Sequence, residues 1–169
     1  MTKVNRIFLV GPMGAGKTSI GSRLARALGY SFVDTDAEIE SRTGVKIEVI
    51  FEIEGEKGFR KREVDVIKDV ASRSQIVMAT GGGSILMPEN RKALTKGYVI
   101  YLNSSVGALL SRVRNDTSRP LLNVSDREKR LRKIVEERKH IYAQVADLTI
   151  KTDDFSIKRI IKKISDEVT

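Results

Sequence analysis

The sequence has no cysteine and no tryptophan, and aromatic residues make up only 5% of its 169 residues. The absence of cysteine excludes a disulfide framework, a thiolate metal site and a cysteine nucleophile. Long apolar runs are also missing: none approaches the roughly 20 residues that cross a bilayer, and the apolar run near the amino terminus is too short for a signal peptide. We therefore expect a soluble cytoplasmic protein that has no membrane partner.

Positive charge is in excess, since 31 Lys and Arg face 22 Asp and Glu, which gives a formal net charge of +9. Residues 110–140 alone hold ten basic and five acidic residues. Such a segment suits a nucleic-acid-binding module, but it also suits an enzyme that holds a nucleoside triphosphate and an anionic second substrate. The few aromatic side chains leave few stacking platforms for single-stranded nucleic acid. Charge alone leaves both classes open.

Hydrophobic patterning along the chain predicts short strands that alternate with helices. The predicted strands are apolar runs of four or five residues at 6–10, 30–34, 75–79, 98–102 and 148–151. The predicted helices lie at 17–28, 37–42, 47–53, 56–72, 88–97, 105–112, 125–145 and 156–167, with Ser125 as N-cap of the long basic helix. This alternation predicts one domain with a three-layer α/β fold, in which helices cover both faces of a five-stranded parallel sheet.

A phosphate-binding motif follows the first predicted strand. The segment GPMGAGKT at residues 11–18 matches the pattern G-x-x-x-x-G-K-[ST], with a strand before it and a helix after it. Its glycines let successive backbone N–H groups point at phosphate oxygens, and the helix adds the positive end of its dipole. Lys17 then reaches the β- and γ-phosphates, and the Thr18 hydroxyl binds Mg²⁺. We predict that ATP is bound by the loop residues Gly14, Ala15, Gly16, Lys17, Thr18 and Ser19.

Two carboxylates, Asp34 and Asp36, stand at the end of the second predicted strand. Ligands bind at the carboxyl ends of parallel strands, and residues two apart in an extended stretch point the same way. Both carboxylates could therefore face one site, where one would support Mg²⁺ and the other would accept a hydroxyl proton. Alternatively, Asp36 could be the N-cap of the helix that follows. The residues by themselves leave both readings open.

Three other segments are candidates for substrate binding. Arg60, in the segment GEKGFR, could bind a carboxylate through its two-pronged guanidinium, or it could be a solvated surface charge. Gly81, Gly82 and Gly83 follow the third strand, where they could bring backbone N–H groups close to a ligand or form a plain loop. The polar loop at 115–122 carries Arg119 and suits a lid that closes over ATP and brings a cation to the γ-phosphate.

Taken together, the motifs GPMGAGKT, DTD, GEKGFR, GGG, RPLL and ERKHIY resemble those of shikimate kinases in order and spacing, from about residue 6 to residue 152. The resemblance implies a nucleoside monophosphate kinase-like fold with five parallel strands in the order 2-3-1-4-5. It also implies transfer of the γ-phosphate of ATP to the 3-hydroxyl of shikimate, on the route to chorismate and the aromatic amino acids. Residues 1–169 would form a single P-loop kinase domain, with a shikimate-binding region at about 34–62 and a lid at about 113–124.

The resemblance assigns the acceptor side of the site to a defined set of residues. Arg60 and Arg138 would bind the carboxylate of shikimate, and Asp36 would contact the reacting hydroxyl as a base or an orienting group. Two phenylalanines would form an apolar wall, and the backbone of the triple glycine would line the ring. The implied substrate-binding residues are Asp36, Phe51, Phe59, Arg60, Gly81, Gly82, Gly83 and Arg138.

The resemblance also assigns the nucleotide side. Lys17 would neutralise charge on the transferring group, Arg119 would close on the phosphates, and Arg112 would lie against the adenine. Asp34 would support the Mg²⁺ shell beside Thr18. The implied catalytic residues are therefore Lys17, Asp36 and Arg119.

One position departs from the family pattern, because Ala79 stands where many members have a serine that would help to hold a water of the Mg²⁺ shell. Thr18 and Asp34 remain for the metal. Three rival interpretations are another small-molecule kinase of the same fold, such as a gluconate kinase, a catalytically silent relative, and a basic nucleic-acid-binding module. We expect ATP and shikimate as the partners, no nucleic acid, and a monomer.

Overall fold

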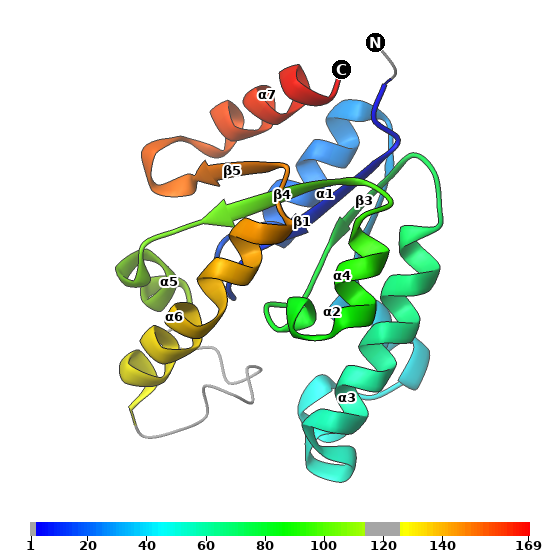
Figure 1. Cartoon of the computed structure of the whole chain (residues 1–169), viewed down its shortest axis with the longest axis vertical. Coiled ribbons are helices and arrows are strands. Elements are labelled where there is room, and N and C mark those ends of the chain that lie inside the picture. Colours follow the sequence, from blue (N-terminus) through cyan, green and yellow to red (C-terminus); the bar gives the residue numbers. More distant parts are fainter. Residues whose placement is uncertain (1–2, 114–125) are drawn as a thin grey trace.

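The computed structural model of the chain describes residues 3–113 and 126–169. Its centre is a sheet in the strand order β2-β3-β1-β4-β5, and every neighbouring pair in it is parallel (Figure 1). The strands are β1 Arg6–Val10, β2 Ser31–Asp34, β3 Ile76–Ala79, β4 Tyr98–Asn103 and β5 Leu148–Lys151. The predicted fold class and strand order are confirmed.

The described helices follow the predicted order closely. They are α1 Lys17–Leu28, α2 Thr35–Thr43, α3 Ile47–Ala71, α4 Pro88–Leu94, α5 Val106–Val113, α6 Arg127–Val145 and α7 Ile157–Val168, with short 3₁₀ turns η1 Ser84–Leu86 and η3 Thr152–Asp154. None of the helices in the described ranges is long and apolar enough to cross a membrane.

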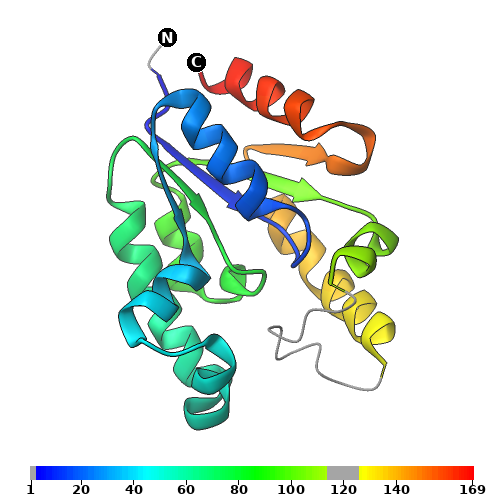
Figure 2. The ribbon, with the colours of Figure 1, turned by 180° about the vertical axis from the view of Figure 1, so that it is seen from behind.

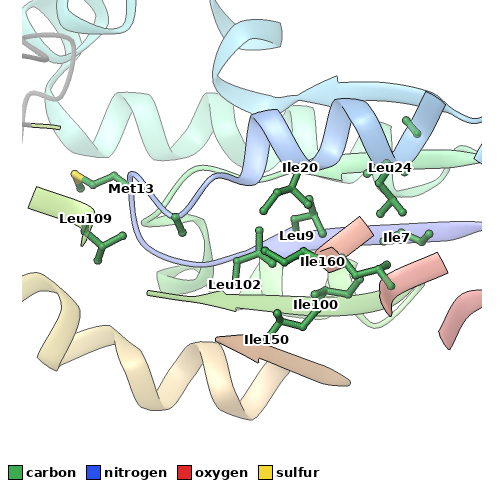
Figure 3. Packing of buried hydrophobic residues seen from close by; sticks show 14 of the residues in the cluster. Ile7, Leu9, Met13, Ile20, Leu24, Ile100, Leu102, Leu109, Ile150 and Ile160 are labelled. Carbon is green, nitrogen blue, oxygen red and sulfur yellow. The ribbon is translucent and has the colours of Figure 1, made fainter. Parts of the chain in front are cut away.

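Helices cover both faces of the sheet, as the patterning predicts. Alternate residues of β1 point to opposite faces, and both Ile7 and Phe8 are completely buried. On one face, Leu9 packs with Ile20 of α1 and Ile160 of α7 (Figure 3). On the other face, the core is formed with α3, α4 and the later part of α6. Figure 2 shows α1 and α7 together on their side of the sheet, with the end of the chain beside its beginning.

The register brings three loops to one edge of the sheet. Asp34 at the end of β2 and Leu9 near the end of β1 are both level with Ala79 at the end of β3. The phosphate-binding loop, the DTD segment and the triple glycine therefore leave the sheet side by side. This edge is where parallel sheets bind ligands.

The predicted start of the long basic helix was wrong. The N-cap of α6 is Asp126, whose carboxylate accepts a hydrogen bond from the Lys129 N–H at 3.0 Å. The predicted cap, Ser125, lies outside the described residues.

The predicted break between the helices at 47–53 and 56–72 is confirmed. Helix α3 is kinked at Gly55, whose φ of 72° and ψ of −178° are not helical. Glycine tolerates this conformation, which other residues disfavour.

Candidate active site

A cavity of about 900 Å³ lies at the carboxyl edge of β1, β2 and β3. It collects most of the predicted site residues from separate parts of the chain. Those that line it are Gly14, Gly16, Lys17, Thr18, Ser19, Asp34, Asp36, Phe51, Phe59, Arg60, Gly81, Gly82, Gly83, Arg112 and Arg138. A second cavity of about 600 Å³, between α4 and the end of α6, holds none of them. Arg119 and residues 114–124 of the predicted lid lie outside the described residues.

The phosphate-binding loop depends on glycines at positions that other residues disfavour. Gly11 has φ of 148°, and a Cβ there would lie 2.6 Å from the carbonyl oxygen of Leu102. Gly16, with φ of 95°, precedes α1, whose first turn has neither a side-chain cap nor an acidic residue. The first-turn N–H groups of α1 therefore point into the loop without a capping side chain and suit an anion.

The ammonium of Lys17 is held inside this loop. Its Nζ donates hydrogen bonds to the carbonyl oxygens of Gly11 at 2.6 Å and Pro12 at 2.8 Å, and the side chain is only 8% exposed. Ala15 differs from its neighbours, because its side chain is buried and its N–H donates to the Pro12 carbonyl at 3.2 Å. Ala15 therefore shapes the loop from behind and does not line the cavity.

The link between β2 and the loop is a contact between Thr18 and Asp34. The Thr18 hydroxyl donates to one carboxylate oxygen of Asp34, and the other oxygen accepts from the Ala37 N–H at 3.0 Å. Asp34 is thus the N-cap of α2. The prediction that an extended stretch aims both carboxylates was wrong, and so was the alternative that Asp36 caps the helix. Strand β2 ends at Asp34, so Asp36 faces the cavity from the first helical turn.

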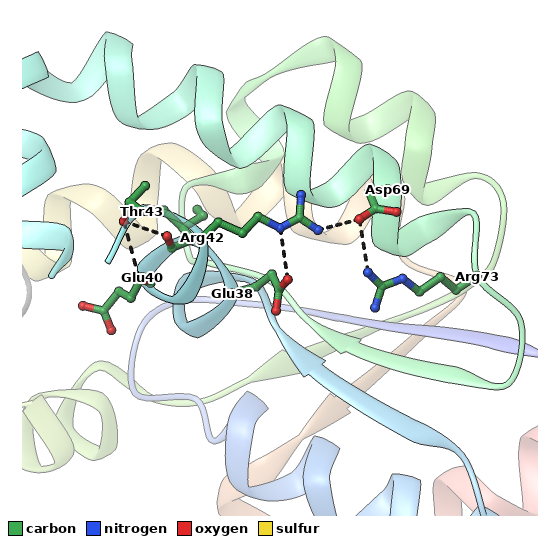
Figure 4. Close-up of polar contacts among 7 residues, drawn as sticks. Glu38, Glu40, Arg42, Thr43, Asp69 and Arg73 are labelled. Carbon is green, nitrogen blue, oxygen red and sulfur yellow. Dashed lines mark hydrogen bonds and ion pairs between the residues drawn. The ribbon is translucent and has the colours of Figure 1, made fainter. Parts of the chain in front are cut away.

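Helix α2, which carries Asp36, is fixed to α3 by ion pairs on the surface (Figure 4). Arg42 contacts Glu38 at 3.0 Å on its own helix and Asp69 of α3 at 2.5 Å, and Asp69 also pairs with Arg73 at 3.1 Å. Exposed pairs of this kind each contribute only about 0–1 kcal/mol. Their main effect is to fix how α2 lies on α3.

The first buried arginine of the cavity is paired with a carboxylate that the sequence analysis missed. Arg60 Nη1 donates to Glu63 Oε1 at 3.0 Å, one turn further along α3, and Glu63 is completely buried. Burial raises the pKa of Glu63 to about 7, although the charge of Arg60 opposes this, and Asp36 raises it further. An acidic residue three positions after an arginine on one helix was the available signal. This ion pair is important because Glu63 is buried. The charged segment RKREVD gives no indication in the sequence that one of its carboxylates is buried.

The glycines after β3 provide room for these charged groups. A Cβ on Gly81 would lie 2.9 Å from an oxygen of Asp36 and 2.9 Å from Glu63 Oε2. A Cβ on Gly83 would lie 2.2 Å from Arg60 Nη2. The side chains of Asp36, Glu63 and Arg60 therefore pack directly on the glycine backbone.

The same glycine segment is held by two hydroxyl groups. The N–H of Gly81 donates to Thr35 Oγ1 at 3.1 Å, and the carbonyl of Gly82 accepts from the Tyr142 hydroxyl at 2.5 Å. The Gly81 N–H is thus occupied within the protein, although the sequence predicted backbone donors for a ligand at all three glycines. Thr35 and Tyr142 were present in the predicted motifs, but no role was predicted for either.

The rest of the cavity wall is aromatic and basic. The rings of Phe51 and Phe59 lie 4.8 Å apart, and the guanidinium of Arg60 lies 5.2 Å from the Phe59 ring. Arg138, from α6, is 6% exposed and lines the cavity. Near the phosphate-binding loop, Arg112 donates to the Gly14 carbonyl at 2.7 Å. The cavity thus has the glycine-rich loop with the Lys17 ammonium at one end and the cationic pair Arg60 and Arg138 at the other.

Comparison with known proteins yields one consistent result. The family model described as shikimate kinase matches residues 13–169. The chain is 48% identical over 161 residues to a shikimate kinase of Halorhodospira halophila, covering 95% of this chain and 91% of that one. It is 48% identical over 165 residues to a shikimate kinase of Methylococcus capsulatus, covering 97% and 92%. The structure of shikimate kinase from Acinetobacter baumannii in complex with shikimate matches with a TM-score of 0.95 and 44% identity, covering 98% of this chain and 93% of that one.

Proposed function

The chain belongs to the shikimate kinase family, and we propose that the 900 Å³ cavity at the carboxyl edge of its sheet is where ATP phosphorylates the 3-hydroxyl of shikimate. The observation that carries this assignment is the division of the cavity. A phosphate-binding loop forms one end, two buried arginines form the other, and Asp36 lies near the second end, beside Gly81. An acceptor with both a carboxylate and a reactive hydroxyl fits that order of groups.

The acceptor end of the cavity, at Arg60 and Arg138, binds and orients shikimate. Arg60 and Arg138 offer guanidinium groups to the carboxylate of shikimate, and the buried surroundings strengthen such charge-assisted hydrogen bonds. The rings of Phe51 and Phe59 supply the apolar wall against which the ring of the substrate packs. Asp36 accepts the hydroxyl proton or orients the hydroxyl for attack. These residue roles are our proposal.

The nucleotide end positions the transferring group. The first turn of α1 and the ammonium of Lys17 neutralise negative charge on the phosphates, and Arg112 lies on the side of the loop where the adenine would rest. Phosphoryl transfer of this kind requires no covalent intermediate with the protein, so alignment and cations supply most of the rate. Arg119 remains the predicted cation of the lid.

A magnesium ion fits the residues present. Thr18 and Asp34 place a hydroxyl and a carboxylate in contact at the mouth of the loop. Mg²⁺ takes one or two protein oxygens together with substrate phosphates, so this pair of groups is sufficient on the protein side. When bound, Mg²⁺ supplies positive charge to the phosphate oxygens. Since residue 79 is an alanine, Thr18 and Asp34 are the protein groups that we assign to it.

We also propose that the enzyme acts as a cytoplasmic monomer without a nucleic-acid partner. On the described surface, the exposed large apolar side chains are scattered over several elements: Val45, Ile53, Leu86 and Ile157. The basic charge of α6 is partly balanced on the helix itself by pairs such as Arg132 with Glu128 at 3.0 Å. Light scattering would test whether the protein is a monomer. Binding of random DNA at micromolar concentrations would contradict the proposal that it has no nucleic-acid partner.

The test of the reaction is ADP release by the purified protein with ATP and Mg²⁺. Shikimate, gluconate and nucleoside monophosphates are compared as acceptors, together with a reaction without acceptor. We expect turnover that requires shikimate. Turnover with gluconate alone would keep the nucleotide end of the site and refute our assignment of Asp36, Arg60 and Arg138.

A further inference from the structure

Tyr142 has no role in the reaction as described so far, yet its hydroxyl sits between two parts of the acceptor site. It lies on α6 one turn after Arg138, and its side chain is 1% exposed. The hydroxyl donates a hydrogen bond to the carbonyl of Gly82 at 2.5 Å, across 60 residues of sequence. A buried phenol needs a partner, and here the partner belongs to the loop that lines the substrate cavity.

The same hydroxyl lies within the electrostatic reach of the second arginine of the site. Burial raises the pKa of Tyr142 to about 12, while the charge of Arg138 opposes the rise. The phenol is thus neutral at physiological pH, so its proton is available for the hydrogen bond to Gly82. Gly82 and Arg138 both line the cavity.

Arg138 itself is buried at the wall of the cavity. Its Nη1 has no hydrogen-bond partner within the described residues. The charge of Arg138 lowers the pKa of Glu63, but no ion pair within 4.0 Å between them occurs in the described part of the chain. The guanidinium therefore keeps a donor for a carboxylate, one turn of α6 before the tyrosine that holds the glycine segment.

The triple glycine depends on Tyr142 for its geometry. A second side-chain tether is Thr35, whose hydroxyl accepts a hydrogen bond from the Gly81 N–H at 3.1 Å. Glycine has more conformational freedom than any other residue, so three in succession hold one geometry only when contacts fix them. Tyr142 fixes the middle residue.

We propose that Tyr142 is a positioning residue for shikimate, which holds the Gly82 backbone in place at the cavity wall, beside Arg138, through its single hydroxyl. The proposal rests on the function assigned above, since it concerns the acceptor end of that site. Tyr142 does not touch the reacting atoms. Its loss should therefore weaken acceptor binding and leave the nucleotide end and the transfer step unchanged.

Tyr101 offers a matched control for a purely structural role. Its ring lies 5.2 Å from the ring of Tyr142 and is also buried, at 4% exposure. Within the described residues its hydroxyl makes no hydrogen bond to the loop or to Arg138, and only burial raises its pKa. Tyr101→Phe removes the same atom from the same cluster without touching the proposed link.

The first test compares steady-state kinetics of the wild type, Tyr142→Phe and Tyr101→Phe, at a temperature well below all three melting midpoints. For Tyr142→Phe we expect the KM for shikimate to rise about 5-fold, because the hydrogen bond that fixes the Gly82 backbone is lost. The kcat and the KM for ATP should stay within about twofold, and Tyr101→Phe should match the wild type. A KM for shikimate within twofold of the wild type would overturn the proposal. A joint fall of kcat and ATP affinity would also overturn it, because it would indicate general damage.

The second test does not depend on the reaction. Amide hydrogen exchange of a peptide spanning residues 80–87 is followed in the protein without substrates. We expect faster exchange in Tyr142→Phe than in the wild type and no change in Tyr101→Phe. Equal exchange in all three proteins would refute the claim that the Tyr142 hydroxyl holds the glycine segment in place. If the wild type itself fails to phosphorylate shikimate, the proposed function fails, and this exchange experiment still decides whether Tyr142 holds the loop.

Discussion

Gly83→Ala places one methyl group against the guanidinium of Arg60. The backbone at Gly83, with φ of −95° and ψ of 4°, accepts alanine without strain. The new Cβ, however, would lie 2.2 Å from Nη2, 2.7 Å from Cζ and 2.8 Å from Nη1 of Arg60. Ordinary contact between such atoms is about 3.5 Å, so the guanidinium has to retreat by about 1 Å or more.

A displacement of that size would remove the contact that we propose between Arg60 and the substrate carboxylate. A hydrogen bond to a charged group contributes about 1.5–3 kcal/mol, so the KM for shikimate should rise about 10- to 150-fold. The variant should still fold, because the displaced atoms are the end of a flexible side chain. It should lose some stability, since Arg60 Nη1 also donates to the buried carboxylate of Glu63. We expect the melting midpoint to fall by about 4–10 °C, which corresponds to roughly 1–3 kcal/mol for a domain of this size.

The assay is steady-state kinetics with shikimate and ATP varied separately, combined with thermal unfolding. Gly107→Ala is the matched control, since a Cβ there meets no atom within 4 Å in the described structure. Gly107 is the second residue of helix α5, so this alanine should stabilise by at most about 0.5–1 kcal/mol and leave both KM values unchanged. If Gly83→Ala kept a wild-type KM for shikimate while folding normally, Arg60 would not bind the carboxylate from its present position.

Three further predictions concern single groups of the cavity. Glu63→Gln should flatten the pH dependence of stability: the folded pKa of about 7 lies above the ordinary 4.5, so wild-type stability falls as pH rises between these values. The wild type should lose about 2 kcal/mol of its free energy of unfolding from pH 5.5 to pH 8. Urea unfolding at both pH values should show this loss in the wild type only. An equal loss in the variant would refute the raised pKa of Glu63. Asp36→Asn should lower kcat by roughly 100-fold or more with little change in the KM for ATP. Glu38→Gln, on the same helix, should keep kcat near the wild-type value. Equal kcat values for the two variants would exclude Asp36 as the group that accepts the proton or orients the hydroxyl. Thr18→Val should raise the Mg²⁺ concentration needed for half-maximal activity, measured by titration at saturating ATP, and an unchanged Mg²⁺ requirement would remove Thr18 from the metal site.

Local patterns were sufficient to predict the fold class and the position of the phosphate-binding loop between β1 and α1. The phosphate-binding loop is a contiguous motif with a strand before it and a helix after it, so its position follows from neighbours in the sequence. Both faces of β1 are buried, as its unbroken apolar run predicts. The strand order came from the family resemblance, because strand lengths alone do not define it.

The errors at the acceptor end have physical causes. Asp34 and Asp36 were placed on an extended segment, but the Asp34 carboxylate caps α2 and converts the next residues to helix. The roles of Thr35 and Tyr142 depend on hydrogen bonds that span 46 and 60 residues. Such contacts exist only after folding, so no local pattern predicts them. Glu63 was missed for a similar reason, since its importance lies in its burial.

The most direct measurement of the central claim is the identity of the phosphorylated product. ³¹P NMR and mass spectrometry are applied to a reaction of the purified protein with ATP, Mg²⁺ and shikimate, with ADP measured in the same sample. We predict one phosphate monoester on the 3-hydroxyl of shikimate for each ADP released. ADP that appears with inorganic phosphate and unmodified shikimate, or phosphate on another hydroxyl, would contradict the assignment of the cavity.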